Sequence, residues 1–167
     1  RVTVRPKSQC SWESQQLHIS DDLGHFPRPF VDSMQMTPAD IAVAYGAKPS
    51  ADVFSAAALI SSWLGIQADY RGIAFSALRD RLPERHGIVI GHPGEQVGGM
   101  MLPETDKPLL RIIANPANPA YKLLLIVGKN DTALRMAAWR LTRGNFAPQT
   151  ATLDVEPQTI PVGKAYD

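Results

Sequence analysis

The sequence predicts an α/β domain, a three-layer sandwich whose mostly parallel sheet carries an antiparallel hairpin at one edge. Continuous apolar runs at 41–45 and 88–90 are typical of strands covered on both faces. A helical pattern follows the first run, and alternation of strands with helices favours a parallel sheet with helices on both faces. Two later runs, 109–114 and 121–127, are separated by too few residues for a parallel crossover and predict the edge hairpin.

Composition sets the scale of the protein. A chain of 167 residues with 44% hydrophobic residues can bury one core. Seventeen Lys and Arg residues balance sixteen Asp and Glu residues, and the basic residues are scattered, so we expect no nucleic-acid partner. A single cysteine, Cys10, rules out an internal disulfide and a cysteine-built zinc site. We find no apolar stretch of eighteen or so residues, and expect no membrane-spanning or targeting segment in this chain.

Prolines and short alternating runs lie on either side of the predicted sheet. Val2 and Val4 alternate with polar residues, as do Leu17 and Ile19, which predicts two short strands foreign to the following domain. Three prolines then interrupt a segment around two phenylalanines and predict an extended connector. The predicted organisation is 1–20 strands of a preceding domain, 21–39 a Pro-rich linker, 40–156 the α/β domain and 157–167 an exit linker.

The first helix is predicted from Ser50, as N-cap, to a C-cap at Gly65. One apolar stripe faces the sheet, and Phe54 and Trp63 flank it in the predicted core. The stripe contains Val53, Ala57, Ile60 and Leu64.

The second cycle is predicted as a short strand at 68–71, a brief helix at 76–82 and the buried strand at 88–90, followed by a long loop over 93–107. After the hairpin, Asn130 or Asp131 caps a last helix that ends at Gly144, and 151–155 alternates as an edge strand. This architecture is flavodoxin-like.

In such sheets ligands bind beyond the carboxyl ends of the strands, here the loops after Tyr45, Ile90 and Val127. A phosphate site needs several glycines or hydroxyls at a helix start, and the residues after Tyr45 supply one of each and a proline. The histidines lack metal-site spacing and are expected to be solvated or locally hydrogen-bonded. We therefore predict no catalytic, cofactor-binding or metal-binding residues.

Trp139 breaks the pattern of the last helix, because it lies on the polar side, about 150° from the inner stripe. Trp, Met and Arg are enriched at protein interfaces. The predicted interface patch is Arg135, Met136, Trp139 and Arg143; the alternatives are burial of Trp139 by neighbouring loops or a tolerated surface aromatic.

Several motifs together resemble one family, the periplasmic B subunit of bacterial cellulose synthase, also named its cyclic di-GMP-binding regulatory subunit. The segment DLGHFPRPF at 22–30 is close to that family's DLSHFPxPF. Departures are Gly24 in place of a common serine, Asn115 in place of a frequent histidine, and an added alanine at 120. Other matching motifs are SSWLG at 61–65, YRG at 70–72, NPANP at 115–119, YKLL at 121–124, GKND at 128–131, Gly144-Asn145 and KAYD at 164–167.

The resemblance implies a non-enzymatic scaffold, the first of two flavodoxin-like domains, between two carbohydrate-binding jelly rolls. Residues 1–20 would end the first jelly roll. The implied location is the periplasm, with membrane contact only through a C-terminal helix outside this chain. The implied partners are the cellulose synthase catalytic subunit, which makes β-1,4-glucan, and the flanking jelly rolls of the same chain.

Three alternatives concern ligands. A carbohydrate-binding domain that contacts the glucan would need exposed aromatics, and these are only 7% of the chain. A flavin- or nucleotide-dependent enzyme rests on fold analogy alone. The family name implies cyclic di-GMP, for which Arg79, Arg81 and Arg85 are the nearest basic cluster; we expect them to form the solvated face of the 76–82 helix and expect no cofactor in this domain.

Overall fold

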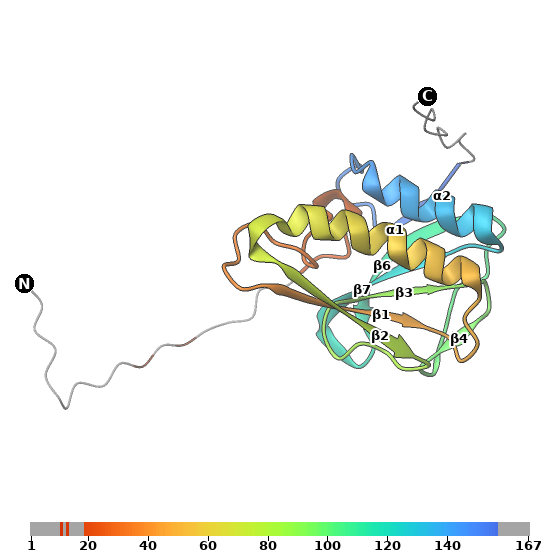
Figure 1. Cartoon of the computed structure of the whole chain (residues 1–167), viewed down its shortest axis with the longest axis horizontal. Coiled ribbons are helices and arrows are strands. Elements are labelled where there is room, and N and C mark those ends of the chain that lie inside the picture. Colours follow the sequence, from red (N-terminus) through yellow and green to blue (C-terminus); the bar gives the residue numbers. More distant parts are fainter. Residues whose placement is uncertain (1–10, 12, 14–18, 157–167) are drawn as a thin grey trace, which may run out of the picture.

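The computed structural model describes residues 11, 13 and 19–156, and its centre is a six-stranded sheet with the strand order β2-β1-β3-β7-β6-β8 (Figure 1). β1 pairs in parallel with β2 and β3, and β3 with β7, whereas β6 is antiparallel to both β7 and β8. The predicted α/β class, mostly parallel sheet and antiparallel edge hairpin are confirmed. The strands are β1 Ala39–Tyr45, β2 Ile73–Arg79, β3 Gly87–Gly91, β6 Leu109–Asn115, β7 Asn118–Val127 and β8 Thr152–Asp154.

Two helices, α1 (Ala51–Ala68) and α2 (Asp131–Thr142), lie together on one face of the sheet (Figure 1). Ser50 and Asn130 cap them as predicted, with side-chain oxygens that accept from Val53 N and Ala133 N. The larger core lies between these helices and alternate side chains of the strands. Its fully buried members include Ile41, Ile60, Ile88, Ile90, Leu124, Ile126 and Leu134.

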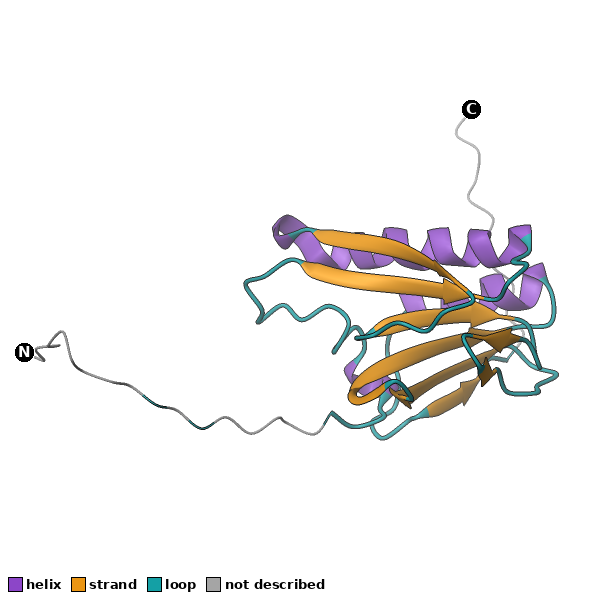
Figure 2. Cartoon of the chain, turned by 90° about the horizontal axis from the view of Figure 1, so that it is seen from below, coloured by secondary structure: helices purple, strands orange, loops and turns teal. Residues whose placement is uncertain are grey.

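The opposite face of the sheet is covered by the segment 80–108, whose loops run in front of the strands in Figure 2. Within it, β4 (Gln96–Val97) and β5 (Met100–Met101) form a small antiparallel sheet. Val97 and Leu102 are buried against Val89 and Leu125. The third layer of the sandwich is therefore this irregular segment, and the expectation of helices on both faces is wrong.

Two predicted elements of the second cycle are also wrong. The residues predicted as a helix at 76–82 belong largely to β2, which pairs residue by residue with β1 and continues into a loop. The residues predicted as a strand at 68–71 end α1 and form a 3-10 turn, Asp69–Arg71. Gly65 lies inside α1, which ends at Asp69 with φ 53°. Phe54, predicted to be in the core, is 49% exposed.

The start and end of the described domain are joined to each other. A 3-10 turn, Leu23–His25, follows Asp22, whose carboxylate accepts from Gly24 N at 2.8 Å and from Thr150 N at 3.1 Å. Leu23 N donates to Thr150 O at 2.8 Å. The hydrogen bonds that backbone N–H groups donate to the Asp22 carboxylate, first of all that from Gly24, lower the pKa of Asp22 below its usual range. We call this contact the neck of the domain.

Part of the predicted linker packs into the core. Leu23, Phe30 and Val31 are buried there, and Phe26 stacks on Trp63 with ring centroids 5.4 Å apart. The proposed domain boundaries stay predictions. The strands predicted within 1–20, apart from Ile19, and the exit linker 157–167 lie outside the described residues.

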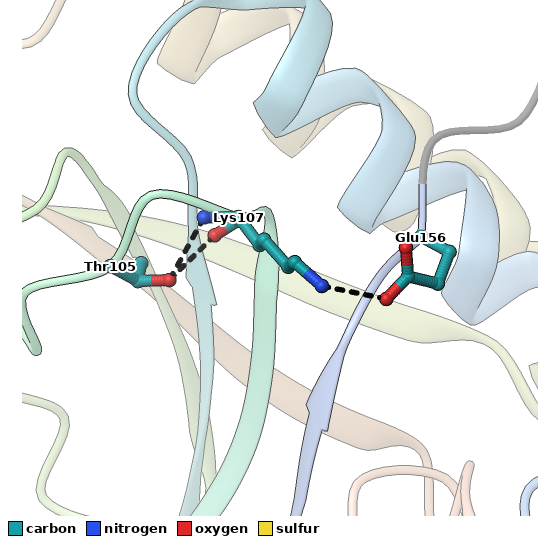
Figure 3. A network of polar contacts seen from close by, with 3 residues as sticks. All are labelled: Thr105, Lys107 and Glu156. Atoms are coloured by element: carbon teal, nitrogen blue, oxygen red, sulfur yellow. Dashed lines mark hydrogen bonds and ion pairs between the residues drawn. The ribbon is translucent and has the colours of Figure 1, made fainter.

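A surface network ties the last described residue to the preceding loop (Figure 3). Lys107 Nζ donates to Glu156 Oε1 at 2.8 Å, and the Thr105 hydroxyl bonds both backbone groups of Lys107. The hydrogen bond with Glu156 raises the pKa of Lys107. Because both charged side chains are exposed, water screens their attraction and the pair contributes little to stability.

Among the described helices, α1 with its following turn is long and apolar enough, by length and composition, to cross a membrane. This helix was not singled out from the sequence as a membrane span, and the expectation that the chain contains no membrane-spanning segment stays a prediction. In this fold α1 packs one face against the sheet, where Val53, Ile60 and Leu64 are buried.

Candidate functional site at the carboxyl ends of the strands

The loops after β1, β3 and β7 meet at one edge of the sheet, as predicted, and the His92 ring joins them. Its Nδ1 lies 2.8 Å from Gly128 O, and its Nε2 lies 3.1 Å from Ser50 Oγ. A carbonyl oxygen can only accept, so Nδ1 carries a proton, and in the neutral ring Nε2 accepts from the Ser50 hydroxyl. Gly128 N also donates to Gly91 O at 3.3 Å. One side chain therefore connects three loops.

Glu95 lies in the crevice between these strand ends. Its Oε2 accepts from His92 N at 2.9 Å. A Cβ added to Gly46 would lie 2.1 Å from Glu95 Oε1, and one added to Gly91 would lie 2.6 Å from Oε2. The two glycines thus provide the space that the carboxylate occupies. A negative charge here disfavours phosphate at the position where a flavodoxin-like sheet receives its ligand.

The Ser50–His92 pair has the contacts of a hydroxyl beside a base, but its surroundings are those of a structural link. Ser50 Oγ also accepts from Val53 N at 3.4 Å as the cap of α1. The His92 ring is oriented by a backbone carbonyl, and the nearby Glu95 contacts the backbone of His92. In the part of the chain that the structure describes, no group of three His, Cys, Asp or Glu residues could hold a metal.

Sequence reasoning located this edge but missed its occupants. Ser50 and His92 are 42 positions apart, and Glu95 sits inside the predicted loop. The available signal was a glycine directly after β1 and another at the end of β3, since such glycines indicate a close approach of another group.

Comparison with known families assigns this fold. The family described as "Cellulose synthase BcsB, first FD domain" matches residues 22–155. The chain belongs to this family. The match confirms the resemblance drawn from the sequence motifs and covers the whole sheet, both helices and the neck.

Relatives in this family carry a name that concerns a nucleotide. Proteins named "Cyclic di-GMP-binding protein" from Escherichia coli strain K12 and Salmonella typhimurium are 31% and 30% identical over 92% and 90% of this chain, and 20% of each relative is covered. The protein of the same name from Komagataeibacter xylinus is 28% identical over 99% of this chain and 21% of its own length. The chain thus spans about one fifth of the curated relatives that it matches.

Of the three arginines weighed for cyclic di-GMP, Arg79 lies apart from the other two in this BcsB domain. Arg79 Nε donates to Ala47 O at 2.7 Å near the carboxyl edge. Arg81 and Arg85 line a depression on the sheet face without helices. The expectation that all three lie on one short helix is wrong, because that helix is absent from the described chain.

The predicted interface patch lies along α2. The Arg143 guanidinium lies 5.1 Å from the centre of the Trp139 ring, which is half-buried. Arg135 is exposed and pairs with Asp131 at 3.6 Å, whereas Met136 is buried. The accessible part is therefore Arg135 and the stack of Arg143 on Trp139, and its role as an interface stays a prediction.

A second surface on this BcsB domain is apolar and lies between α1 and the edge strand β2. Phe54 is 49% and Phe75 38% exposed, and they border a groove of about 190 Å³. Tyr45 packs edge-on against Phe54 with centroids 5.3 Å apart. From 53 to 68, α1 carries no charged residue. We call this area the α1/β2 surface.

Proposed function

We propose that this chain is a non-catalytic scaffold domain of a periplasmic cellulose synthase regulatory subunit. In this proposal it supports β-1,4-glucan synthesis and translocation with the catalytic subunit. It does so by packing against other parts of that assembly, including the flanking domains of its own protein. The inner membrane is reached through a helix outside this chain.

The α1/β2 surface carries the proposal. A helix exposed to water normally has a polar outer face, but α1 is uncharged over four turns and exposes Phe54 and Ile66. Contiguous exposed apolar side chains beside an edge strand are typical of contact surfaces. Relatives about five times as long as this chain offer ample protein to cover such a surface.

The filled crevice supports the non-catalytic part of the proposal. Glu95 and His92 occupy the place where a flavin or nucleotide would bind, and their hydrogen bonds serve to join loops. We further propose that cyclic di-GMP, named in the relatives, is not held by this domain. Calorimetric titration of the chain with cyclic di-GMP tests this, and saturable binding would contradict it.

The test of the scaffold role uses the full-length protein with its catalytic subunit. Phe54→Asp combined with Phe75→Asp places two charges in the α1/β2 surface, and we expect loss of the assembly or of cellulose output. Both side chains are partly exposed, so the 167-residue chain with the same changes should remain folded by circular dichroism. Met34→Asp is the matched control, because Met34 is 78% exposed and outside that surface. A normal assembly with normal output in the double variant would refute the role of this surface.

One observation favours direct contact with a glucan as a second function. The sheet face without helices carries depressions lined by charged and polar side chains, unlike the apolar α1/β2 surface, and such a lining suits the hydroxyl groups of a sugar.

A further inference from the structure

Two neighbouring polar depressions near the amino ends of the strands share part of their lining, and together we call them the polar groove. The first, about 230 Å³, lies on the sheet face turned away from the helices and includes Asp40, Ser76 and Arg81. The second, about 320 Å³, includes Asn118 and Tyr121. Glu84 and Arg85 line both, so they form the border at which the two halves meet. Ligand pockets start at about 300 Å³, a volume that the second depression reaches by itself.

The backbone under this groove is fixed by a buried amide. Asn115 has no exposed surface, and its Nδ2 donates to Pro83 O at 2.7 Å and to Arg85 O at 3.0 Å. Its Oδ1 accepts from Ala117 N at 2.9 Å. The β6–β7 turn thereby holds the segment that presents Glu84 and Arg85. A site fixed before binding loses less entropy when a ligand arrives.

The aromatic end of the groove is fixed as well. The Tyr121 ring packs against the His86 ring at 5.0 Å and 84°. His86 Nδ1 accepts from Lys122 N at 2.9 Å, and Phe30 contacts the same ring at 6.0 Å. Tyr121 is half-buried, so part of its ring remains available beside Asn118 and Arg85. An aromatic ring with a polar rim suits the apolar face and hydroxyl edge of a sugar.

Charge indicates which ligand the groove suits. Asp40 and Glu84 supply two carboxylates, and Arg81 and Arg85 supply two guanidiniums. None of the ion pairs among the described residues involves these four side chains. The formal charges cancel, so neither an anion nor a cation is favoured. A neutral ligand with many hydroxyls can donate to the carboxylates and accept from the guanidiniums, and such charge-assisted hydrogen bonds are strong.

We propose that this groove binds a neutral oligosaccharide, with Glu84, Arg85 and Tyr121 as its central contacts. A β-1,4-glucan fits that chemistry, and its choice among neutral sugars rests on the proposed function. The groove and the α1/β2 surface occupy opposite faces of the sheet, so one face serves the polymer and the other serves protein contacts.

The test is titration of the 167-residue chain with cellohexaose, followed by NMR and by calorimetry. We expect saturable binding in the range of about 1 mM. Glu84→Ala and Arg85→Ala should each weaken it about tenfold, since each removes hydrogen bonds to a charged group. Both side chains are exposed, so folding should be unaffected. Arg135→Ala, an equally exposed arginine on α2, is the control and should bind as the parent chain does.

Two results would overturn the inference: no binding at the highest soluble sugar concentration, or binding that neither groove variant weakens. Cyclic di-GMP binding that Arg85→Ala abolishes would overturn it too, because the groove would then be an anion site. Failure of this inference can be told apart from failure of the proposed function. The Phe54→Asp/Phe75→Asp chain should bind cellohexaose normally, so loss of assembly and loss of sugar binding are scored on different variants.

Discussion

The ion pair between Asp21 and Lys122 should respond very differently to removal of its two partners. Lys122 Nζ lies 2.6 Å from Asp21 Oδ1 across 101 residues of chain. The Lys122 side chain is 5% exposed, whereas that of Asp21 is 44% exposed. Asp21→Ala leaves a buried ammonium without its counter-charge, but Lys122→Met leaves a carboxylate that water can solvate.

The exposures set the magnitude. Breaking a fully buried pair costs about 3–5 kcal/mol, and an exposed pair contributes about 0–1 kcal/mol. With one buried partner, we expect Asp21→Ala to lower the free energy of unfolding by about 2 kcal/mol. Met has a similar length and is apolar, so Lys122→Met should change it by less than about 1 kcal/mol. The corresponding fall in Tm for Asp21→Ala is about 4–8 °C in a domain of this size.

The assay is urea unfolding of the 167-residue chain, followed by tryptophan fluorescence and circular dichroism. The double variant Asp21→Ala/Lys122→Met completes the cycle and should be nearly as stable as Lys122→Met alone, because the stranded charge is gone. A larger loss for Lys122→Met than for Asp21→Ala would refute the reasoning, since it would mean that the lysine stem, not its charge, is what matters.

Four further predictions concern stability. Burial lowers the pKa of His86 below its ordinary 6.5, so the unfolded chain binds the proton more readily and stability falls as the pH drops below about 6.5; His86→Gln should flatten that part of the unfolding free energy measured against pH. In Gly128→Ala the new Cβ would lie 2.7 Å from Leu134 N, and we expect a loss of about 2–3 kcal/mol in denaturant unfolding. Gly65→Ala, in open space inside α1, should instead raise stability by about 0.5–1 kcal/mol; a loss would contradict the helical placement of Gly65. Asn115→Ala removes the amide that donates to two backbone carbonyls and should lower the free energy of unfolding by about 2 kcal/mol, measured in denaturant.

Among the correctly predicted strands, β3 and β7 are buried on both faces over most of their length and have the plainest sequence signal. β3 is buried at every residue and β7 from 122 to 127, and the sequence is continuously apolar over 88–90 and 123–127. The helix starts were equally predictable, because Ser50 and Asn130 are strong N-caps with acids in the following turn.

β2 was missed because it is an edge strand that exposes most of its length. With little burial on either face, its residues need not alternate between apolar and polar. Leu78 and Leu82 have the i, i+4 spacing of a helix, but one packs from the strand and the other from the loop beyond it. Without that helix, both helices of the described domain lie on one face, which no local pattern could indicate.

The sequence predicted where the candidate site lies but not which side chains occupy it. Parallel strands bring their carboxyl ends to one edge, so the three loops could be named from strand assignments alone. Glu95 reaches that edge from a loop with a small hairpin, and its partner groups are backbone atoms and two glycines. No pairing of side-chain types in the sequence encodes such contacts.

The neck brings the first and last parts of the domain next to each other in space. Leu23 and Thr150 are hydrogen-bonded although nearly the whole sheet and both helices lie between them in sequence. Residues that are adjacent in space at the two ends of a module allow it to be inserted into a longer chain with little displacement of what stands on either side. Evolution can then add, duplicate or lose such a unit as one piece, and a chain several times longer can contain it without a change in the folds of the neighbouring domains.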